Sequence, residues 1–338
     1  MKENIVVAVA GATGAVGEAM LDLLIRRRFP ASSVHALASA RSVGRQVGFG
    51  NRTLDVKNLA TFDFSEVDIA LFSAGASVSE EHATRAAAEG CVVIDNTSCF
   101  RYDDDVPLVV PEVNADAIGR FRERNLIANP NCSTIQMLVA LKPIYDKAGI
   151  ERINVATYQA VSGAGRSAIE QLASQTACLM NGRPLDDKKE QIAFNVRPQI
   201  DTFLDNGYTR EEMKMVWETR KILEDDSIMV NPTAARVPVF YGHSEAVHIE
   251  TREKLSAAEA RQLLENAPGI EVMDQRAADG YPTAALHAAG NDPVYVGRIR
   301  DDISHERGLA LWVVADNVRK GAALNSVQIA ELLVKDHL

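Results

Sequence analysis

No apolar run in the chain approaches the ~18–20 residues that a membrane-spanning helix needs. Lysine and arginine number 36 against 46 acidic residues, and no block of like charge stands out, so no basic face for nucleic acid is expected. The four cysteines, Cys91, Cys99, Cys132 and Cys178, show no CxxC or other metal-ligand spacing. These absences argue against a membrane, nucleic-acid or metal-binding protein and favour a reducing, cytoplasmic compartment.

The residues that are present suit a globular protein of about two domains, because 46% of the 338 residues are hydrophobic. Residues 4–10 (NIVVAVA) run directly into a glycine loop without a cleavage-site pattern, and so predict a buried first strand instead of a signal peptide. Further apolar runs at 34–39, 68–74 and 91–96 alternate with helical stretches. This alternation predicts an α/β domain with a doubly wound parallel sheet.

The pattern changes after about residue 130, where longer alternating strands are separated by fewer helices. It predicts an α+β catalytic and dimerisation domain with a mixed sheet, one face covered by helices and the other by a second subunit. The amphipathic last segment is expected to return to the first domain. We therefore predict a dinucleotide-binding domain over 1–130 and 317–338, a second domain over 131–316, and a homodimer or a dimer of dimers.

Three glycines, Gly11, Gly14 and Gly17, lie between the first strand and a helical pattern. Their GxxGxxG spacing is one residue longer than the usual dinucleotide fingerprint, but it serves the same physics. Glycines permit a tight turn and close approach of the backbone to a pyrophosphate, and a helix N-terminus favours the anion. The alternative is an ordinary tight turn. The predicted cofactor-binding loop comprises Gly11, Thr13, Gly14, Ala15, Val16 and Gly17.

The second apolar run ends in LASARS, where an NAD-binding chain usually places Asp or Glu for the ribose hydroxyls. Ser39, Arg41 and Ser42 occupy this stretch instead. An arginine with two hydroxyls suits a ribose 2′-phosphate, so the predicted cofactor is NADP. The alternative is that Arg41 is a solvated loop charge.

Cys132 follows the strand-breaking triplet Asn129-Pro130-Asn131 and is predicted to open a helix. Unpaired backbone N–H groups at a helix start lower the pKa of a thiol and favour the thiolate. The same groups can stabilise the oxyanion formed when a thiolate attacks a carbonyl. Cys132 is therefore predicted to be a nucleophile that forms a covalent thioester, although an isolated cysteine is more often a packing residue.

A thiolate needs a partner that can hold its proton. His243 is preceded by a glycine and is expected at a strand turn, whereas His248 lies on the following strand and could equally be a packed core residue. Spacing alone does not decide between them.

Seven segments in the same order resemble the aspartate-β-semialdehyde dehydrogenase family over the whole chain. They are GATGAVG, DNTSCFRYDDDVPLVVPEVN, NPNCSTIQ, TYQAVSGAG, EEMKMVWETRKIL, ARVPVFYGHSE and the closing helix. The resemblance implies reversible reductive dephosphorylation of L-aspartyl-4-phosphate to L-aspartate 4-semialdehyde with NADPH. It also implies a place in lysine (through diaminopimelate), methionine and threonine biosynthesis.

The same resemblance implies roles for individual residues. Cys132 is the nucleophile, His243 the acid/base, and Gln159 orients the substrate beside the cysteine. Ser162 and Gly163 lie in a loop near the cofactor.

Further implied roles concern the charged groups of the substrate and the nicotinamide, which Asn317 is expected to approach. Arg101 and Lys214 match phosphate-binding positions, Arg236 the carboxylate-binding position and Glu211 a position near the ammonium. A guanidinium can hold a carboxylate through two hydrogen bonds, which suits this assignment. The alternative for Glu211 and Lys214, three residues apart, is a solvated helix face.

Two other functions compete with this interpretation. An N-acyl-glutamyl-phosphate reductase would act on a substrate without an ammonium group, so Glu211 would have no purpose there. A non-catalytic NADP-binding protein on the same fold would show no cysteine-dependent turnover.

Overall fold

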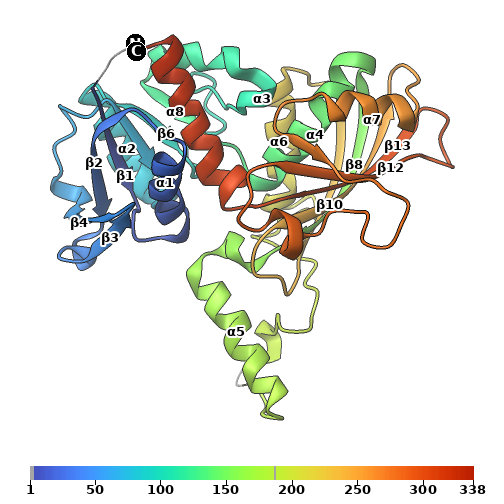
Figure 1. The fold of residues 1–338 in the computed structure, drawn as a ribbon, viewed down its shortest axis with the longest axis horizontal. Helices are drawn as coiled ribbons and strands as arrows, with labels where there is room; N and C mark the ends of the chain where they lie inside the picture. The colour runs from blue at the N-terminus through green and yellow to red at the C-terminus, as the bar shows by residue number, and fades with distance from the viewer. Residues whose placement is uncertain (1–3, 186–187) are drawn as a thin grey trace. The chain divides into compact units, whose positions relative to one another are not determined.

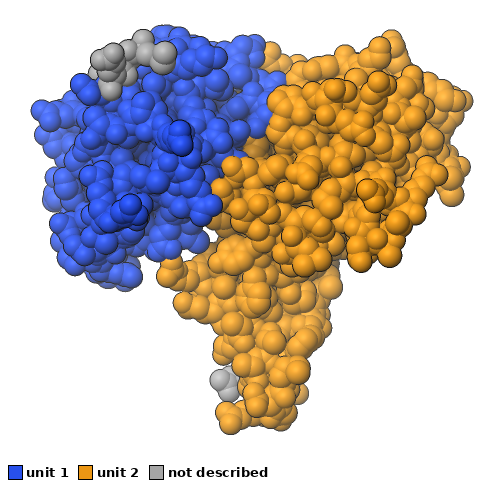
Figure 2. Space-filling model, viewed as in Figure 1, with its two compact units in different colours: residues 1–131, 321–338 blue, residues 132–320 orange. Residues whose placement is uncertain are grey.

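The computed structural model describes residues 4–185 and 188–338. The chain forms two compact units, Met1–Asn131 with Gly321–Leu338 (unit 1) and Cys132–Lys320 (unit 2). Figure 1 shows the elements along the chain, and Figure 2 colours the two units. The chain crosses from unit 1 to unit 2 between residues 131 and 132 and returns between residues 320 and 321. The expected divisions were after residue 130 and before residue 317.

Unit 1 is built on a seven-stranded sheet of order β3-β4-β2-β1-β5-β6-β7, parallel except where β3 runs antiparallel to β4. Its strands are β1 (Ile5–Ala10), β2 (Ala31–Ala38), β3 (Gln46–Phe49), β4 (Arg52–Asn58), β5 (Ile69–Phe72), β6 (Val92–Asp95) and β7 (Leu126–Ala128). Its helices are α1 (Ala15–Arg26), α2 (Ala76–Ala88), α3 (Pro111–Asn114) and α8 (Leu324–Asp336). The predicted, mostly parallel α/β sheet is confirmed.

The order of strands reverses between β1 and β5, because the chain goes from β1 outward to β2 and from β5 outward to β6. In open α/β sheets a ligand binds at such a switch point, beyond the carboxyl ends of the strands. The predicted glycine loop follows β1 at this point.

The core of unit 1 lies between its sheet and the helices. Alternate residues of β1 and the apolar face of α8, including Leu324, Val327 and Leu333, share one buried cluster. Burying each of these side chains contributes about 1.5–3 kcal/mol. α8 begins at Leu324, directly after a π-helical turn at Arg319–Ala323.

Unit 2 is built on a six-stranded mixed sheet of order β11-β12-β13-β10-β8-β9. β8 pairs parallel with β9 and β11 with β12, while the other pairs are antiparallel. Its strands are β8 (Ile150–Gln159), β9 (Met229–Arg236), β10 (His243–Thr251), β11 (Ile270–Val272), β12 (Val294–Asp301) and β13 (Gly308–Ala315). Its helices are α4 (Cys132–Ala148), α5 (Arg166–Met180), α6 (Arg210–Leu223) and α7 (Ala257–Glu265).

The two faces of the unit 2 sheet differ. α4, which packs on α6 and α7 as well as on β8, β10, β12 and β13, covers one face. On that face β10 buries His243, Glu245 and Val247, since alternate residues of a strand share a face. On the other face Tyr158 is 38% exposed and stacks at 5.6 Å on half-buried Trp312. The predicted mixed sheet with one helix-covered face is confirmed.

The strands β3, β4 and β11 were not predicted. β4 alternates charged and apolar residues around a single buried position, Val56, and β11 has only three residues, so neither carries a clear apolar run. Among residues 4–185 and 188–338, no helix is both long and apolar enough to cross a membrane.

Candidate active site

The glycine loop of unit 1 has the tight geometry that its spacing predicts. Gly11 has a φ of +85°, and a Cβ there would lie 2.5 Å from the Ser73 carbonyl oxygen beyond β5. A Cβ on Gly17 would lie 2.2 Å from the Gly11 carbonyl oxygen. The backbone segments of the loop therefore lie so close together that no side chain could stand between them. Such a tight turn is the geometry that lets a backbone approach a pyrophosphate closely.

The rest of the loop leads into α1. Gly14 is the N-cap of α1, which begins with Ala15 and Val16, while Thr13 is half-buried just before it. Gly14 offers no side chain to cap the first turn. The backbone N–H groups of that turn are thus the donors that a bound phosphate would use.

Ser39, Arg41 and Ser42 lie together just beyond the carboxyl end of β2. Ser39 caps a short 3-10 turn over Ala40–Ser42, and the Ser42 N–H donates to the Ser39 carbonyl oxygen at 2.8 Å. Arg41 is exposed.

Cys132 is the first residue of α4, four residues after β7 ends at Ala128. The thiol is half-buried. α4 begins at Cys132 directly after Pro130 and Asn131, as the sequence predicts, so the residue occupies the first turn, where backbone N–H groups have no partner within the helix. Arg236, at the end of β9, is electrostatically coupled to Cys132 and Glu211, which together offset part of the fall in the Arg236 pKa caused by burial.

Gln159, at the end of β8, connects three elements. Its amide Nε2 donates to Ser133 Oγ at 3.0 Å, to Glu211 Oε1 at 3.2 Å and to Thr157 Oγ1 at 3.3 Å. Ser133 directly follows Cys132, so Gln159 is tied to the first turn of α4. Sequence reasoning missed Ser133, although its position next to the cysteine was a usable signal.

His243 begins β10 and is fully buried. Its Nδ1 accepts the Ala160 N–H at 3.1 Å, so the neutral ring carries its proton on Nε2. Burial, reinforced by Arg236 and opposed by Glu211, lowers the pKa of His243 to about 3. His243 is therefore a neutral hydrogen-bond donor near neutral pH, because burial disfavours the charged imidazolium form.

Among the described residues, His243 Nε2 is buried without a hydrogen-bond partner. A buried donor without a partner is costly unless a substrate group meets it. The suggestion that His248 is a packed core residue is wrong: it is exposed, because it points to the opposite face of β10 from His243.

Arg236 and Gly163 lie against His243. Arg236 Nη1 donates to the Ala160 carbonyl oxygen at 2.8 Å. A Cβ on Gly163 would lie 3.0 Å from Arg236 Nη1 and 3.3 Å from His243 Cε1. Gly163 therefore leaves room around both side chains.

Lys214 and Glu211 share one face of α6. Lys214 Nζ contacts Glu211 Oε2 and Asp201 Oδ2, each at 3.0 Å. Burial alone would lower the Lys214 pKa, but Glu211 and Asp201 together raise it. The solvated-face alternative is wrong, since Glu211 is 6% exposed and Glu218 is fully buried. Asp201 was missed, because it lies in a loop without regular spacing.

Asn317 holds two loops beside His243. Its Oδ1 accepts from the Gly242 N–H at 2.9 Å, and its Nδ2 donates to Ser162 Oγ at 2.9 Å. Ser162 lies in the short 3-10 turn Val161–Ala164, which also contains Gly163.

We call the unit 2 residues gathered here the polar corner. Its members are Cys132, Ser133, Gln159, Glu211, Lys214, Arg236 and His243.

Arg101 belongs to unit 1. It is 6% exposed, and its Nη2 donates to the Asn96 carbonyl oxygen at 2.9 Å. It also offsets part of the rise in the Asp95 pKa that burial causes.

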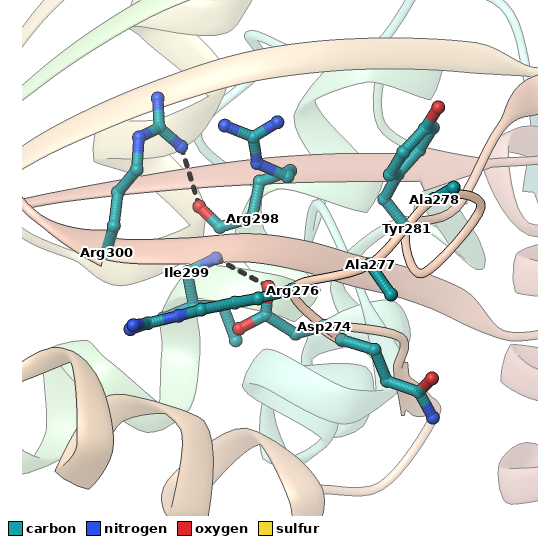
Figure 3. A pocket seen from close by; sticks show the side chains of 9 residues that line it. Asp274, Arg276, Ala277, Ala278, Tyr281, Arg298, Ile299 and Arg300 are labelled. Carbon is teal, nitrogen blue, oxygen red and sulfur yellow. Dashed lines mark hydrogen bonds between the residues drawn. The ribbon is translucent and has the colours of Figure 1, made fainter.

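The hollows on the other face of the unit 2 sheet are a different feature. One, of about 590 Å³, lies between β12 and the loop that carries Asp274, Arg276 and Tyr281 (Figure 3). Figure 3 shows Arg298 and Arg300 beside it, with Arg300 Nη1 donating to the Arg298 carbonyl oxygen at 2.6 Å. It contains no thiol or histidine, so the polar corner remains the candidate active site.

No group of three or more histidine, cysteine or acidic side chains suited to a metal ion occurs in the described part of the chain. The corner instead combines a thiol at a helix start with a neutral imidazole donor and a half-buried guanidinium. This is chemistry for covalent catalysis at a carbonyl carbon.

Two family models match the chain in succession. Residues 6–121 match the semialdehyde dehydrogenase NAD binding domain, and residues 141–320 match the semialdehyde dehydrogenase dimerisation domain. The chain thus has the two domains of a semialdehyde dehydrogenase, with a domain that binds a nicotinamide dinucleotide.

Curated relatives narrow this class. The aspartate-semialdehyde dehydrogenase of Legionella pneumophila is 62% identical over 340 residues, which cover 100% of this chain and 98% of the relative. That of Bacillus subtilis is 48% identical over 349 residues, covering both chains fully. The chain belongs to the aspartate-semialdehyde dehydrogenase family, and the N-acyl-glutamyl-phosphate reductase alternative is not supported.

Solved structures agree. Aspartate semialdehyde dehydrogenase II from Vibrio cholerae, complexed with ASA, has a TM-score of 0.97 at 60% identity, with both chains fully covered. The Candida albicans enzyme with NADP has a TM-score of 0.76 at 26% identity, with 98% of each chain covered.

Proposed function

We propose that this chain catalyses the NADPH-dependent reductive dephosphorylation of L-aspartyl-4-phosphate to L-aspartate 4-semialdehyde, and the reverse. The observation that carries the proposal is the polar corner, in which the Cys132 thiol opens α4 and lies within electrostatic reach of Arg236. Full-length relatives named aspartate-semialdehyde dehydrogenase support it. The product would serve lysine, methionine and threonine biosynthesis.

Cys132 is the proposed nucleophile. Its thiolate attacks the acyl carbon of the substrate, and the carbon–oxygen bond to phosphate breaks, with the phosphate leaving with the bonding electrons. The result is a thioester on Cys132. First-turn N–H groups of α4 stabilise both the thiolate and the oxyanion of this step.

His243 is the proposed acid/base. Because its Nδ1 is occupied by the Ala160 N–H, only Nε2–H faces the reacting oxygen. In the reductive direction this group gives a hydrogen bond, or its proton, to the oxyanion on the former thioester carbon. As the carbonyl re-forms and the carbon–sulfur bond breaks, any proton held by the oxygen returns to Nε2, the aldehyde is released and the Cys132 thiolate is restored.

Four charged side chains would hold the substrate. Arg236 would bind the α-carboxylate through its two-pronged guanidinium, and Glu211 would bind the ammonium. Lys214 and Arg101 would bind the phosphoryl group. Gln159, held by Glu211 and Ser133, would orient the substrate at Cys132.

NADP is the proposed cofactor, and it supplies the hydride when bound. Gly11, with its positive φ, and the closely packed Gly17 fit its pyrophosphate, along with Thr13, Gly14, Ala15 and Val16 at the start of α1. Ser39, Arg41 and Ser42 would hold the 2′-phosphate. Ser162, Gly163 and Asn317 would line the nicotinamide end.

We also propose that the protein is a homodimer, or a dimer of dimers, through the open face of the unit 2 sheet. Tyr158 and Trp312 leave aromatic surface on that face, and the matching family model is a dimerisation domain. Light scattering of the purified protein tests this, and a monomer at micromolar concentration would contradict it.

The activity is tested by phosphate-dependent formation of NADPH from L-aspartate 4-semialdehyde and NADP. We expect turnover with this substrate and none with N-acetyl-L-glutamate 5-semialdehyde. The reverse preference would restore the N-acyl-glutamyl-phosphate alternative, and no turnover with either would overturn the proposed reaction.

A further inference from the structure

Glu245 is a fully buried acid that the proposed chemistry does not use. It lies on β10 two residues beyond His243, and both side chains therefore point to the face that α4 covers. Beyond it on the same face come Val247 and Ile249, which are apolar and buried. The carboxyl thus lies at the border between the polar corner and the apolar core.

The surroundings of Glu245 contain polar but uncharged groups. Its strand partners are Thr157 on β8 and Val313 on β13, and α4 supplies Ser133 and Gln136. The remaining titratable group on the same face of β10 is His243, which is neutral near pH 7.

Burial raises the pKa of Glu245 well above its usual range, and the Gln136 amide and Ser133 hydroxyl lower it only in part. Within residues 4–185 and 188–338, the groups that lower the Glu245 pKa are these two uncharged side chains. Burial therefore favours the protonated carboxyl over the carboxylate.

A protonated carboxyl suits the polar groups around it. Glu245 Oε1, Glu245 Oε2 and Gln136 Oε1 are three buried oxygens that have no hydrogen bond of normal geometry among the described residues. A carboxylic acid carries one O–H donor and one carbonyl acceptor, whereas a carboxylate can only accept. The acid has the donor that Gln136 Oε1 lacks and an acceptor for the Ser133 hydroxyl, the two side chains beside it.

Ser133 and Gln136, the two α4 residues beside Glu245, are each linked to a residue of the polar corner. Ser133 directly follows Cys132 and accepts from Gln159 Nε2 at 3.0 Å. Gln136 Nε2 reaches the His243 carbonyl oxygen at 3.5 Å. Movement of Ser133 and Gln136 would therefore displace the first turn of α4, the Gln159 amide and the start of β10 together.

We propose that Glu245 is a positioning residue that acts as a neutral carboxylic acid, fixing Ser133 and Gln136 and through them the first turn of α4 around Cys132. The inference rests on the proposed role of Cys132 as the reactive thiol. An ionised Glu245 would instead place a negative charge behind the thiolate and disfavour it.

The experiment measures alkylation of Cys132 by iodoacetamide across pH, read from the mass of its peptide, in the full-length protein. In Glu245→Leu, which keeps the volume but no hydrogen bond, we expect the midpoint of the profile to rise and kcat to fall by roughly 10- to 100-fold. Glu245→Gln, a neutral amide of the same shape, is expected to bring back the parent midpoint and most of kcat. Glu250→Leu, on the same strand but half-exposed, is the matched control and should change neither.

Two results would overturn the inference. A Glu245→Gln midpoint well below that of the parent protein would mean that a negative charge had been removed, so Glu245 would be ionised. A parent-like midpoint and kcat in Glu245→Leu would mean that Glu245 positions nothing.

Infrared spectroscopy gives a measurement that does not depend on the leucine variant folding. We expect a carbonyl stretch of a protonated carboxylic acid at pH 8 that is absent from Glu245→Gln. Its absence from the parent protein would contradict the neutral state. Failure of the proposed function looks different, since the parent protein itself would then show no turnover with L-aspartate 4-semialdehyde, while the alkylation profile and the infrared band of Glu245 could still be measured.

Discussion

The glycine loop of unit 1 and the polar corner of unit 2 are built in opposite ways. The loop is almost entirely backbone, and its shape follows from the absence of Cβ atoms at Gly11 and Gly17. The corner consists of side chains from α4, α6, β8, β9 and β10, held by hydrogen bonds such as those of Gln159. Backbone sites respond to steric change, whereas side-chain networks respond to the loss of single polar atoms.

Of the variants that test this contrast, Cys132→Ser is expected to have the largest effect. A hydroxyl has a much higher pKa than a thiol and is a far weaker nucleophile here, so we expect turnover below about one part in 10⁴ of the parent. NADP binding, followed by fluorescence titration, should be almost unchanged because the glycine loop is in unit 1. Substantial turnover in the purified variant would rule out the covalent mechanism.

His243→Ala should lower kcat by roughly 10²–10⁴-fold. Because the pKa of His243 is lowered to about 3, the imidazole stays neutral as pH falls from 8 to 5. The kcat profile of the parent protein should therefore lack an inflection near the ordinary imidazole pKa of ~6.5. His248→Ala is the control and should retain turnover and melting temperature, and a collapse there with active His243→Ala would reverse the assignment.

Gly11→Ala tests the backbone side of the comparison. A Cβ at this φ of +85° would meet the Ser73 carbonyl oxygen at 2.5 Å, and we expect a loss of about 2–4 kcal/mol in unfolding free energy with loss of NADP binding. Gly44→Ala is the matched control, since its φ of +86° is the same but nothing lies within 4 Å. Equal losses in the two variants, measured by denaturant titration, would show that φ alone matters.

Lys214→Leu should raise the KM for phosphate by roughly 10²-fold, because it also leaves Glu211 and Asp201 without their cation. Arg101→Leu should act in the same direction, while the KM for NADP changes little in either variant. Lys221→Leu, on the last turn of the same helix, is the control. A larger effect on NADP than on phosphate would move these residues to the cofactor site.

Arg41→Ala should have the smallest effect. Loss of one charge-assisted contact with a 2′-phosphate should reduce the preference for NADP over NAD by roughly tenfold. The ratio of kcat/KM for the two cofactors measures it. Equal use of both cofactors by the parent protein would refute the interpretation of Ser39, Arg41 and Ser42.

Much of unit 1 could be predicted because its signals are local. A strand, three glycines and a helix are contiguous in the chain, and each glycine marks a backbone position where the tight turn needs a residue without a Cβ. The start of α4 at Cys132 was predictable for the same reason, since Pro130 ends the strand beside it.

The polar corner was harder because its contacts are not local. Gln159 and Glu211 meet across 52 residues, and no periodicity reports such a contact. Burial decided against the alternative for α6, a solvated face, which its charged sequence left open, because Glu211, Glu212 and Glu218 are buried. The choice of His243 over His248 required family resemblance, because strand alternation places them on opposite faces only once the strand bounds are known.

The last helix has a consequence for synthesis of the protein. Asn325 Nδ2 donates to the Val109 carbonyl oxygen and to Asn129 Oδ1, across 216 and 196 residues, and Ser326 Oγ donates to Asn96 Oδ1 across 230. α8 also completes the apolar cluster of unit 1. The part of unit 1 that precedes unit 2 therefore cannot complete its core until α8 has been synthesised. Unit 2 emerges from the ribosome before that point, while the core of unit 1 is still exposed. Nascent chains stalled before α8 are the species that most need a chaperone.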